Sequence, residues 1–219
     1  PYIEKAIAGE SGRDVFFDSA GNPVMTCYEP LDIDGLRWAQ VTKMDMEECF
    51  SQKADGETED YFTKYVEAYG YYDLFLFTEG GYCFYSVGRE ADYHTDLKDG
   101  KYAASPLGKA VRATLKQRDF AFADFEPYAP SDGVPAAFIT QPVIEGGEMP
   151  VVVGLQLATG AINDMMHVGC DKERTLEAYL VGPDHHMRSD SVLNADDTIA
   201  KSFAENRRVE TEATEAALA

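Results

Sequence analysis

Residues 71–87 decide the fold, because they contain a strand, a tight turn and a second strand in direct succession. The first run, residues 71–78, reads YYDLFLFT, and the second run, residues 82–87, reads YCFYSV. Both runs are rich in the aromatic and aliphatic residues that favour strands. Glu79-Gly80-Gly81 between them has the composition of a turn. The stretch therefore predicts an antiparallel hairpin.

A helix and three more strands are expected after this hairpin. The pattern predicts a helix over residues 102–116 and strands over 120–125, 136–144 and 149–157. Antiparallel hairpins with a helix inserted after the second strand favour an α+β class with a PAS-like sheet. The longest apolar run, at 149–155, is far shorter than the roughly 18 residues that a membrane span requires.

The remaining chain contains further elements on both sides of this unit. Before it, strands are predicted at 13–18, 23–28 and 36–44, with a loop at 29–35 and a connecting helix at 45–70. After it, the pattern predicts a helix at 161–168, a hairpin formed by 177–181 and 186–191, and a polar helix at 195–219. These elements are the parts of a second α+β unit.

Composition restricts the partners of the chain. The 219 residues carry 19 Lys and Arg against 39 Asp and Glu, which gives a formal net charge of -20. Such a charge argues against binding to nucleic acid and to anionic lipid, because both need a positive protein surface. The hydrophobic content of 45% is too high for a disordered acidic tail. The chain opens without the basic and apolar regions of a signal peptide, so we expect that segment to be absent or removed.

Several motifs together resemble the double Cache sensor domains of bacterial chemoreceptors and sensor kinases. They are found at residues 69–76, 124–131, 135–139, 177–184 and 187–191, and again at 21–24, 28–31 and 35–39. The resemblance implies two PAS-like Cache units, each an antiparallel sheet with flanking helices, joined by a long helix. It implies a complete distal unit at 57–168 and a second unit made of 169–219 together with 1–44. It also implies an extracytoplasmic location.

The order of the motifs differs from that of the family. The strands that close the second unit come first here, so the chain resembles a circular permutant, with the two membrane-side ends of the family joined through residues 45–62. The helix end Thr214-Glu215-Ala216-Ala217-Leu218-Ala219 also resembles Ile3-Glu4-Lys5-Ala6-Ile7-Ala8. Residues 1–44 can then complete the sheet of their own chain or that of a neighbour, and the second route builds a filament.

The family resemblance also implies a ligand site in the distal unit. The positions that could line it are Tyr85, Tyr102, Ser105, Asp124, Tyr128, Phe138 and Thr140. A carboxylate among aromatic rings suits an amine or an amino acid, and an organic acid stays open. Alternatively, these aromatic residues are core residues and Asp124 caps a loop.

Other polar motifs have structural interpretations. Arg188 and Asp190 alternate with Ser189 and suggest an ion pair that holds the second hairpin. The acidic loops at 32–35, 96–100 and 194–197 could hold Ca²⁺, although solvated turns are the alternative and no other cofactor is expected. Cys27 and Cys83 lie in apolar runs as buried thiols, and a Cys27–Cys170 disulfide is the alternative.

Two functions remain open at the level of sequence. The first is a small-molecule-binding sensor module without membrane anchors. The second is a secreted structural subunit that polymerises by exchanging terminal segments. No catalytic motif is recognised, so we expect no enzyme activity.

Overall fold

The computed structural model describes residues 2–171, 173 and 175–219. The chain divides into two compact units, residues 1–64 and residues 65–219. Each unit has its own antiparallel sheet, with three strands in the first unit and five in the second.

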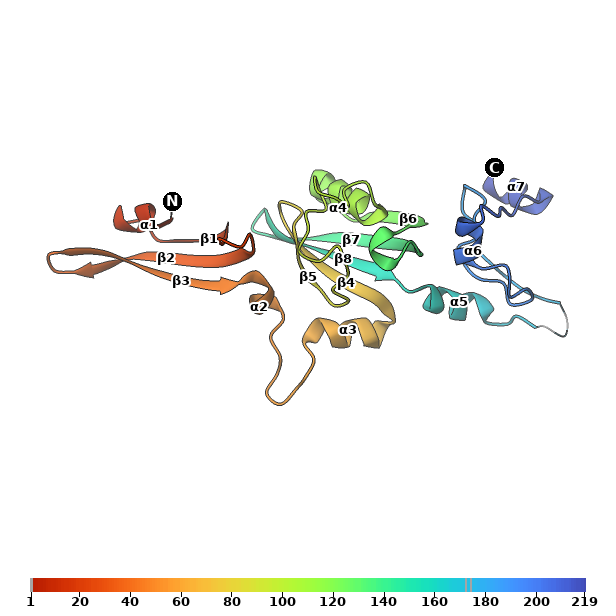
Figure 1. Ribbon diagram of the computed structural model, residues 1–219, viewed down its shortest axis with the longest axis horizontal. Coiled ribbons are helices and arrows are strands. Elements are labelled where there is room, and N and C mark those ends of the chain that lie inside the picture. Colours follow the sequence, from red (N-terminus) through yellow and green to blue (C-terminus); the bar gives the residue numbers. More distant parts are fainter. Residues whose placement is uncertain (1, 172, 174) are drawn as a thin grey trace. The chain divides into compact units, whose positions relative to one another are not determined.

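The second unit is built on the five-stranded sheet (Figure 1). Its strands are β4 (Tyr71–Thr78), β5 (Cys83–Ser86), β6 (Ala121–Pro127), β7 (Pro135–Glu145) and β8 (Glu148–Leu157). They lie in the order β5-β4-β8-β7-β6. Strand β4, the first of the five in the sequence, therefore pairs with β8, the last, which is a PAS-like arrangement. The predicted hairpin, helix and three strands are thereby confirmed, and the fold class is α+β.

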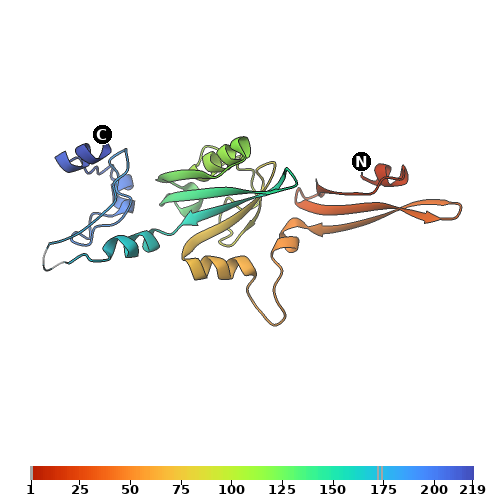
Figure 2. The same ribbon diagram turned by 180° about the vertical axis from the view of Figure 1, so that it is seen from behind.

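Helix α4 (Pro106–Gln117) covers one face of this sheet, where it packs on β6 and β7 (Figures 1 and 2). It begins later than predicted because the Ser105 hydroxyl accepts a hydrogen bond from the Gly108 amide and Pro106 occupies the first turn. Leu107 and Val111, one helical turn apart, are fully buried in the core against Phe75, Phe77 and Phe138. Burial of each such side chain contributes roughly 1.5–3 kcal/mol. We call this face of the sheet the inner face.

The other face of the sheet has its own apolar cluster. Phe125 and Ala137 are buried there together with Ile199 of α6 (Ile199–Ala204). Ile162 of α5 (Thr159–His167) and Phe203 of α6 pack against them. The C-terminal segment is therefore anchored to the sheet through α6.

The predicted hairpin at 177–191 and the predicted helix at 195–219 are corrected by the structure. The hairpin pairs only through an isolated bridge between Val181 and Met187, and the hydroxyl of Ser189 takes the place of a backbone acceptor for the Leu180 amide. In place of one polar helix there are two short ones, α6 and α7 (Glu212–Leu218). Without neighbouring strands, the hairpin lacks the ladder that would hold it regular.

The first unit is a three-stranded antiparallel sheet with one short helix packed on it. Its strands are β1 (Gly12–Phe17), β2 (Pro23–Ile33) and β3 (Leu36–Asp45), in that order. The predicted loop at 29–35 is wrong, because β2 continues to Ile33 and only Asp34 and Gly35 turn. Helix α1 (Tyr2–Ile7) packs on β2 and β3.

The expected long helix at 45–70 is also corrected. The structure has two short helices there, α2 (Met46–Phe50) and α3 (Tyr61–Tyr69), separated by residues 51–60. That separating stretch contains Asp55-Gly56, and Gly56 has a φ of 84°, which a continuing right-handed helix cannot adopt. The grouping of 169–219 with 1–44 as one split unit stays a prediction.

Candidate functional site

Asp73 is a buried carboxylate on the inner face. Alternation along β4 places it on the same side as Phe75 and Phe77, and it lies opposite Gln156 of β8. Its side chain accepts hydrogen bonds from the Ser86 hydroxyl at 2.8 Å, the Gly88 amide at 3.0 Å and the Leu74 amide at 2.6 Å. These donors compensate part of the cost of burying a charge.

The chain after β5 adds two more carboxylates. Asp92 is fully buried and accepts a hydrogen bond from the Tyr128 hydroxyl. Glu90 accepts hydrogen bonds from the Tyr72 hydroxyl at 2.8 Å and from the Ser131 hydroxyl at 2.6 Å. We call Asp73, Glu90 and Asp92 the carboxylate cluster.

Two buried oxygens beside these carboxylates find no hydrogen-bond donor among the described residues. They are Oδ1 of Asp92 and Oε1 of Gln156. The Gln156 amide nitrogen donates to the Ser131 hydroxyl at 3.4 Å, which links it to the Glu90 side of the cluster. Both oxygens are hydrogen-bond acceptors, so a bound group that satisfies them must donate hydrogen bonds through N–H or O–H groups.

Asp73 and Asp92 each have a pKa above that of an isolated aspartate. Burial, with a smaller contribution from the nearby charge of Asp92, raises the pKa of Asp73 to about 6, against the hydrogen bonds that lower it. Burial likewise raises the pKa of Asp92, against the hydrogen bond from Tyr128, and the charge of Glu90 adds to the increase. Like charges in a dry site favour the neutral acids, and a cation at the same place would favour the carboxylates.

Most of the residues predicted to line a ligand site lie in the packed core or at the start of a helix. Tyr102, Tyr128 and Phe138 belong to the inner-face core, where the rings of Tyr128 and Phe138 meet edge to face with centroids 4.7 Å apart. Ser105 is the N-cap of α4. Of this set, Tyr128 reaches the carboxylate cluster through its hydroxyl group.

Three further predicted residues have other surroundings. Thr140 on β7 shares a hydrogen bond of 2.7 Å with Thr114 of α4. Tyr85 lies opposite Leu76 of β4, a position on the other face of the sheet from Phe75 and Phe77. Asp124 accepts two hydrogen bonds from Arg188. Whether any of these residues contacts a ligand stays a prediction.

Arg188 and Asp190 do not pair with each other. Arg188 binds Asp124 and also Asp184, at 2.9 Å, and its guanidinium lies 5.2 Å from the Phe203 ring centroid. Asp190 accepts a hydrogen bond from the Asn163 amide at 2.8 Å and another from the Ile199 backbone amide at 2.7 Å. The expected ion pair within the hairpin is therefore replaced by contacts to α5, α6 and β6.

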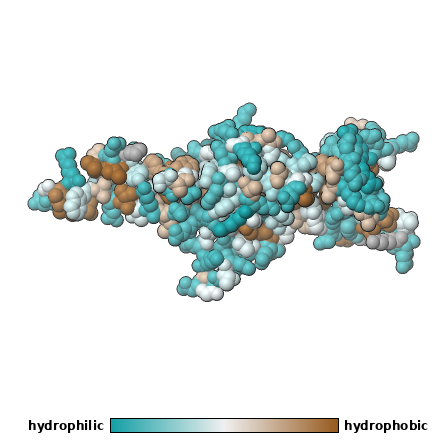
Figure 3. Space-filling view, viewed as in Figure 1, coloured by the Kyte–Doolittle hydropathy of each residue, from teal (hydrophilic) through white to brown (hydrophobic). Residues whose placement is uncertain are grey.

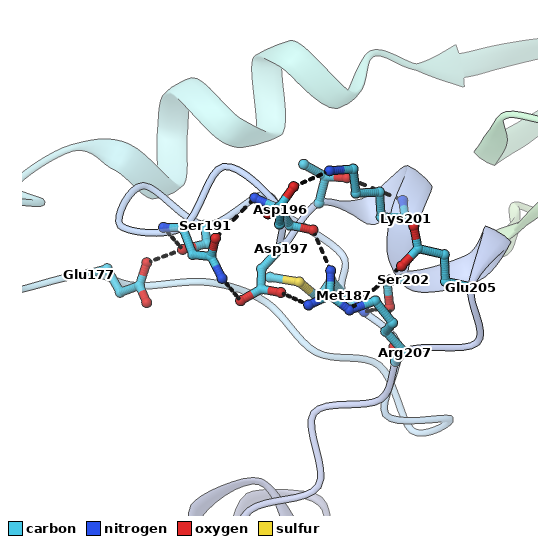
Figure 4. Close-up of polar contacts among 11 residues, drawn as sticks. Glu177, Met187, Ser191, Asp196, Asp197, Lys201, Ser202, Glu205 and Arg207 are labelled. Carbon is cyan, nitrogen blue, oxygen red and sulfur yellow. Dashed lines mark hydrogen bonds and ion pairs between the residues drawn. The ribbon is translucent and has the colours of Figure 1, made fainter.

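The C-terminal segment has a polar hollow of about 310 Å³ (Figure 4). Arg207 pairs with Asp197 at 2.9 Å and donates to the Asp196 carbonyl at 2.7 Å. The Ser191 hydroxyl donates to Glu177 at 2.6 Å, and the Ser202 hydroxyl accepts from the Met187 amide at 3.0 Å. These lining groups are satisfied by one another, so the hollow is a weaker candidate than the carboxylate cluster.

Sequence reasoning missed Asp73, Glu90, Asp92 and Gln156. The sequence does carry one signal for Asp73: an aspartate inside the otherwise apolar run at 71–78 is costly to bury and therefore indicates hydrogen-bond partners in the fold. The other three residues lie in a loop and on the last strand. Only the pairing of β4 with β8 brings Gln156 opposite Asp73.

The remaining predictions concern metals, cysteines and membranes. Within the described part of the chain, no three acids, histidines or cysteines gather as a metal site, and Asp96 of one acidic loop accepts from the amides of Lys98 and Asp99. All four cysteines are free thiols; Cys83 is buried as predicted, whereas Cys27 is exposed. Among the described residues, no helix has the length and apolar character needed to cross a bilayer.

Among known proteins, similarity to this chain is found in solved structures. No family model and no curated protein matches the chain. It is similar to the sensor domain of the histidine kinase DctB of V. cholerae, with 17% identity over 48% of this chain and 37% of that one, at a TM-score of 0.37.

Two other solved structures are similar over more of the chain. The ligand-binding domain of the Pseudomonas fluorescens chemoreceptor CtaA, solved with L-isoleucine, shows 12% identity over 67% of this chain and 56% of that one, at a TM-score of 0.42. The extracellular domain of the histidine kinase mmHK1S-Z3 shows 16% identity over 78% and 57%, also at 0.42. The chain thus spans less than two thirds of each of these three solved domains. The first is a sensor domain, the second a ligand-binding domain and the third an extracellular domain of a histidine kinase.

Proposed function

We propose that the chain is an extracytoplasmic sensor-type module that binds a small organic cation, an amine or an amino acid, at the carboxylate cluster. The observation that carries the proposal is the pair of buried acceptors without donors in the described part of the chain, Asp92 Oδ1 and Gln156 Oε1. An ammonium group has three N–H donors and no acceptor, which matches this requirement.

The charges of the cluster support the same ligand class. One acceptor belongs to the Asp92 carboxylate and the other to Gln156, which lies opposite Asp73, and burial opposes the ionisation of both Asp73 and Asp92. A positive ligand group lets them ionise without mutual repulsion, whereas an organic acid would add another negative charge. Tyr72 and Tyr128 reach the cluster through their hydroxyl groups, which donate hydrogen bonds to Glu90 and Asp92.

The test is a thermal-unfolding screen of the whole chain at pH 7.5. The panel holds amines, amino acids and organic acids of matched size. We expect amines or amino acids to raise the Tm and organic acids to leave it unchanged, since a ligand that binds only the folded state stabilises it. Stabilisation by organic acids alone would contradict the proposal.

A pair of variants ties the effect to the site. Asp92→Asn removes the charge of the carboxylate that carries one of the two unsatisfied acceptors, and it should abolish the Tm shift. Asp196→Asn changes a carboxylate at the hollow of the C-terminal segment and should leave the shift intact. A shift that survives Asp92→Asn but disappears in Asp196→Asn would move the site to the hollow.

The proposed role is binding without turnover. The exchange of terminal segments between chains, with residues 1–44 completing a neighbour's sheet, stays the alternative suggested by the rotated order of motifs. Its measurable consequence is assembly of the purified chain into polymers. A chain that stays monomeric at high concentration speaks against it.

A further inference from the structure

Helix α1 occupies a seat on the first sheet. Helix α1 packs on β2 and β3; Ala6 of α1 is fully buried, and Val24, Thr26 and Tyr28 of β2 are buried as well. The Tyr2 ring packs on Phe16, with centroids 4.9 Å apart. Ile3 and Ile7 of this helix are about half exposed, and Figure 3 shows hydrophobic residues at the surface in the part of the chain that contains α1. We call the surface under α1 the α1 seat.

Helix α7 has a sequence similar to that of α1 but is not packed in a comparable way. Aligned residue by residue, 214–219 (TEAALA) matches 3–8 (IEKAIA), with Glu215 in the place of Glu4 and Ala217 in the place of Ala6. All residues of α7 are described, and none of them is buried. A helix of two turns is not stable in water without packing, even with the Thr211–Thr214 capping box that begins α7.

The charges of α7 also suit the α1 seat. Lys43 of β3 lies over the Tyr2 ring at the start of α1, with its ammonium 4.7 Å from the ring centroid. Helix α7 carries Glu212 and Glu215 in its first turn. A docked α7 would bring these carboxylates near Lys43, in a chain whose net charge of -20 otherwise opposes association.

We propose that the α1 seat also accepts α7 of a second copy of this chain, with Ala217 in the place of Ala6. Helix α1 is then the internal occupant that keeps the seat closed. Because α1 is tethered to β1 by only four residues, 8–11, its effective concentration at the seat is high. The match of α7 is also weaker at one point, since Ala213 stands where α1 has Tyr2. The unaltered chain is therefore monomeric, and release of α1 allows copies to join.

Opening the seat in the full chain tests the proposal. In Ala6→Glu a charged side chain replaces a fully buried methyl group, which should eject α1. Sedimentation velocity should then show species of two or more copies that grow with protein concentration. Ala217→Glu alone should leave the chain monomeric, and the double variant Ala6→Glu/Ala217→Glu should return it to a monomer.

A peptide experiment separates the seat from other contacts. A fluorescent peptide of residues 208–219 should bind Ala6→Glu, as followed by anisotropy, at least about tenfold more tightly than it binds the unaltered chain, in which the tethered α1 competes for the seat. The same peptide with Ala217→Glu should not bind. Peptide binding that does not depend on Ala217 would overturn the proposal.

A second variant guards against misfolding. Removal of residues 1–8 empties the seat without adding a charge, and fluorescence of Trp38, the one tryptophan in the sequence, reports whether β3 keeps its environment. If this variant and Ala6→Glu both keep the sheet and both stay monomeric, the seat does not accept a second copy. The same result would follow if α7 docked on the seat of its own chain, and that outcome also overturns the proposal.

Discussion

Arg188 holds Asp124 through two parallel hydrogen bonds of 2.8 Å, across 64 residues of sequence. The guanidinium group is mostly buried, and it also binds Asp184 and the His186 carbonyl. This fork-to-carboxylate geometry is among the stronger polar contacts in proteins. It ties the irregular C-terminal segment to β6.

Loss of this contact should destabilise the second unit. We expect Arg188→Ala to lower the free energy of unfolding by about 1–3 kcal/mol, as for hydrogen bonds to charged groups, since the carboxylates of Asp124 and Asp184 remain partly exposed. Urea denaturation measures the change. As a control, Lys109→Ala breaks the exposed Lys109–Glu126 pair and should cost less than about 1 kcal/mol. Equal effects of the two substitutions would show that Arg188 is no anchor.

Asp73 should make the fold less stable as the pH rises from 4 to 6. Its pKa in the folded chain is about 6, above the value of 3.8 for a free side chain, mainly because of burial. The folded state therefore binds more protons in this window, so the free energy of unfolding falls by up to about 3 kcal/mol and levels off above pH 6. Urea midpoints at half-unit steps of pH should show the decline, and Asp73→Asn should remove it.

A companion variant checks that the hydrogen bonds set this behaviour. Ser86→Ala removes a donor that lowers the pKa of Asp73. The stability decline should then extend to higher pH than in the unaltered chain. A decline that ends at lower pH, or that persists in Asp73→Asn, would assign it to another group.

Ligand binding should be coupled to protons at the same cluster. A cation needs the ionised carboxylates, so its affinity should weaken by about tenfold per pH unit below the pKa of Asp73, provided one proton is displaced. Titration calorimetry of the amine found in the thermal screen, at pH 5.0 and pH 7.5, measures this effect. Binding that is equally tight at both pH values would show that the ligand does not bind at the carboxylate cluster.

The four cysteines should differ in reactivity. Burial raises the pKa of Cys83 well above its ordinary value, and burial together with the charges of Glu48 and Asp45 raises the pKa of Cys49. Because the thiolate is the nucleophile, alkylation at pH 8 should modify exposed Cys27 first and Cys83 only after unfolding. Peptide mass spectrometry after timed exposure to iodoacetamide resolves the order. Early modification of Cys83 would mean that the inner-face core opens readily.

Local sequence signals predicted the five-stranded sheet well. Strand β4 was expected over its observed bounds, and β7 and β8 within one residue, because alternation and glycine turns act over short distances. The hairpin predicted at 177–191 forms only an isolated bridge, since a hairpin becomes regular beside a strand that continues its ladder. The prediction of one connecting helix at 45–70 is wrong for a related reason. Residues 52–59 are all exposed, so they gain no burial that would favour a helix over a turn.

The sequence by itself determined the α+β class, the order of elements in the second unit and the acidic balance of the chain. The tertiary structure decided where the polar groups meet. Asp73, Glu90, Asp92 and Gln156 come from two strands and a loop, and their joint character arises only when β4 pairs with β8 and the segment after β5 closes over them. Hydrogen bonds and pKa values depend on distance and burial in three dimensions, which spacing along the chain does not specify.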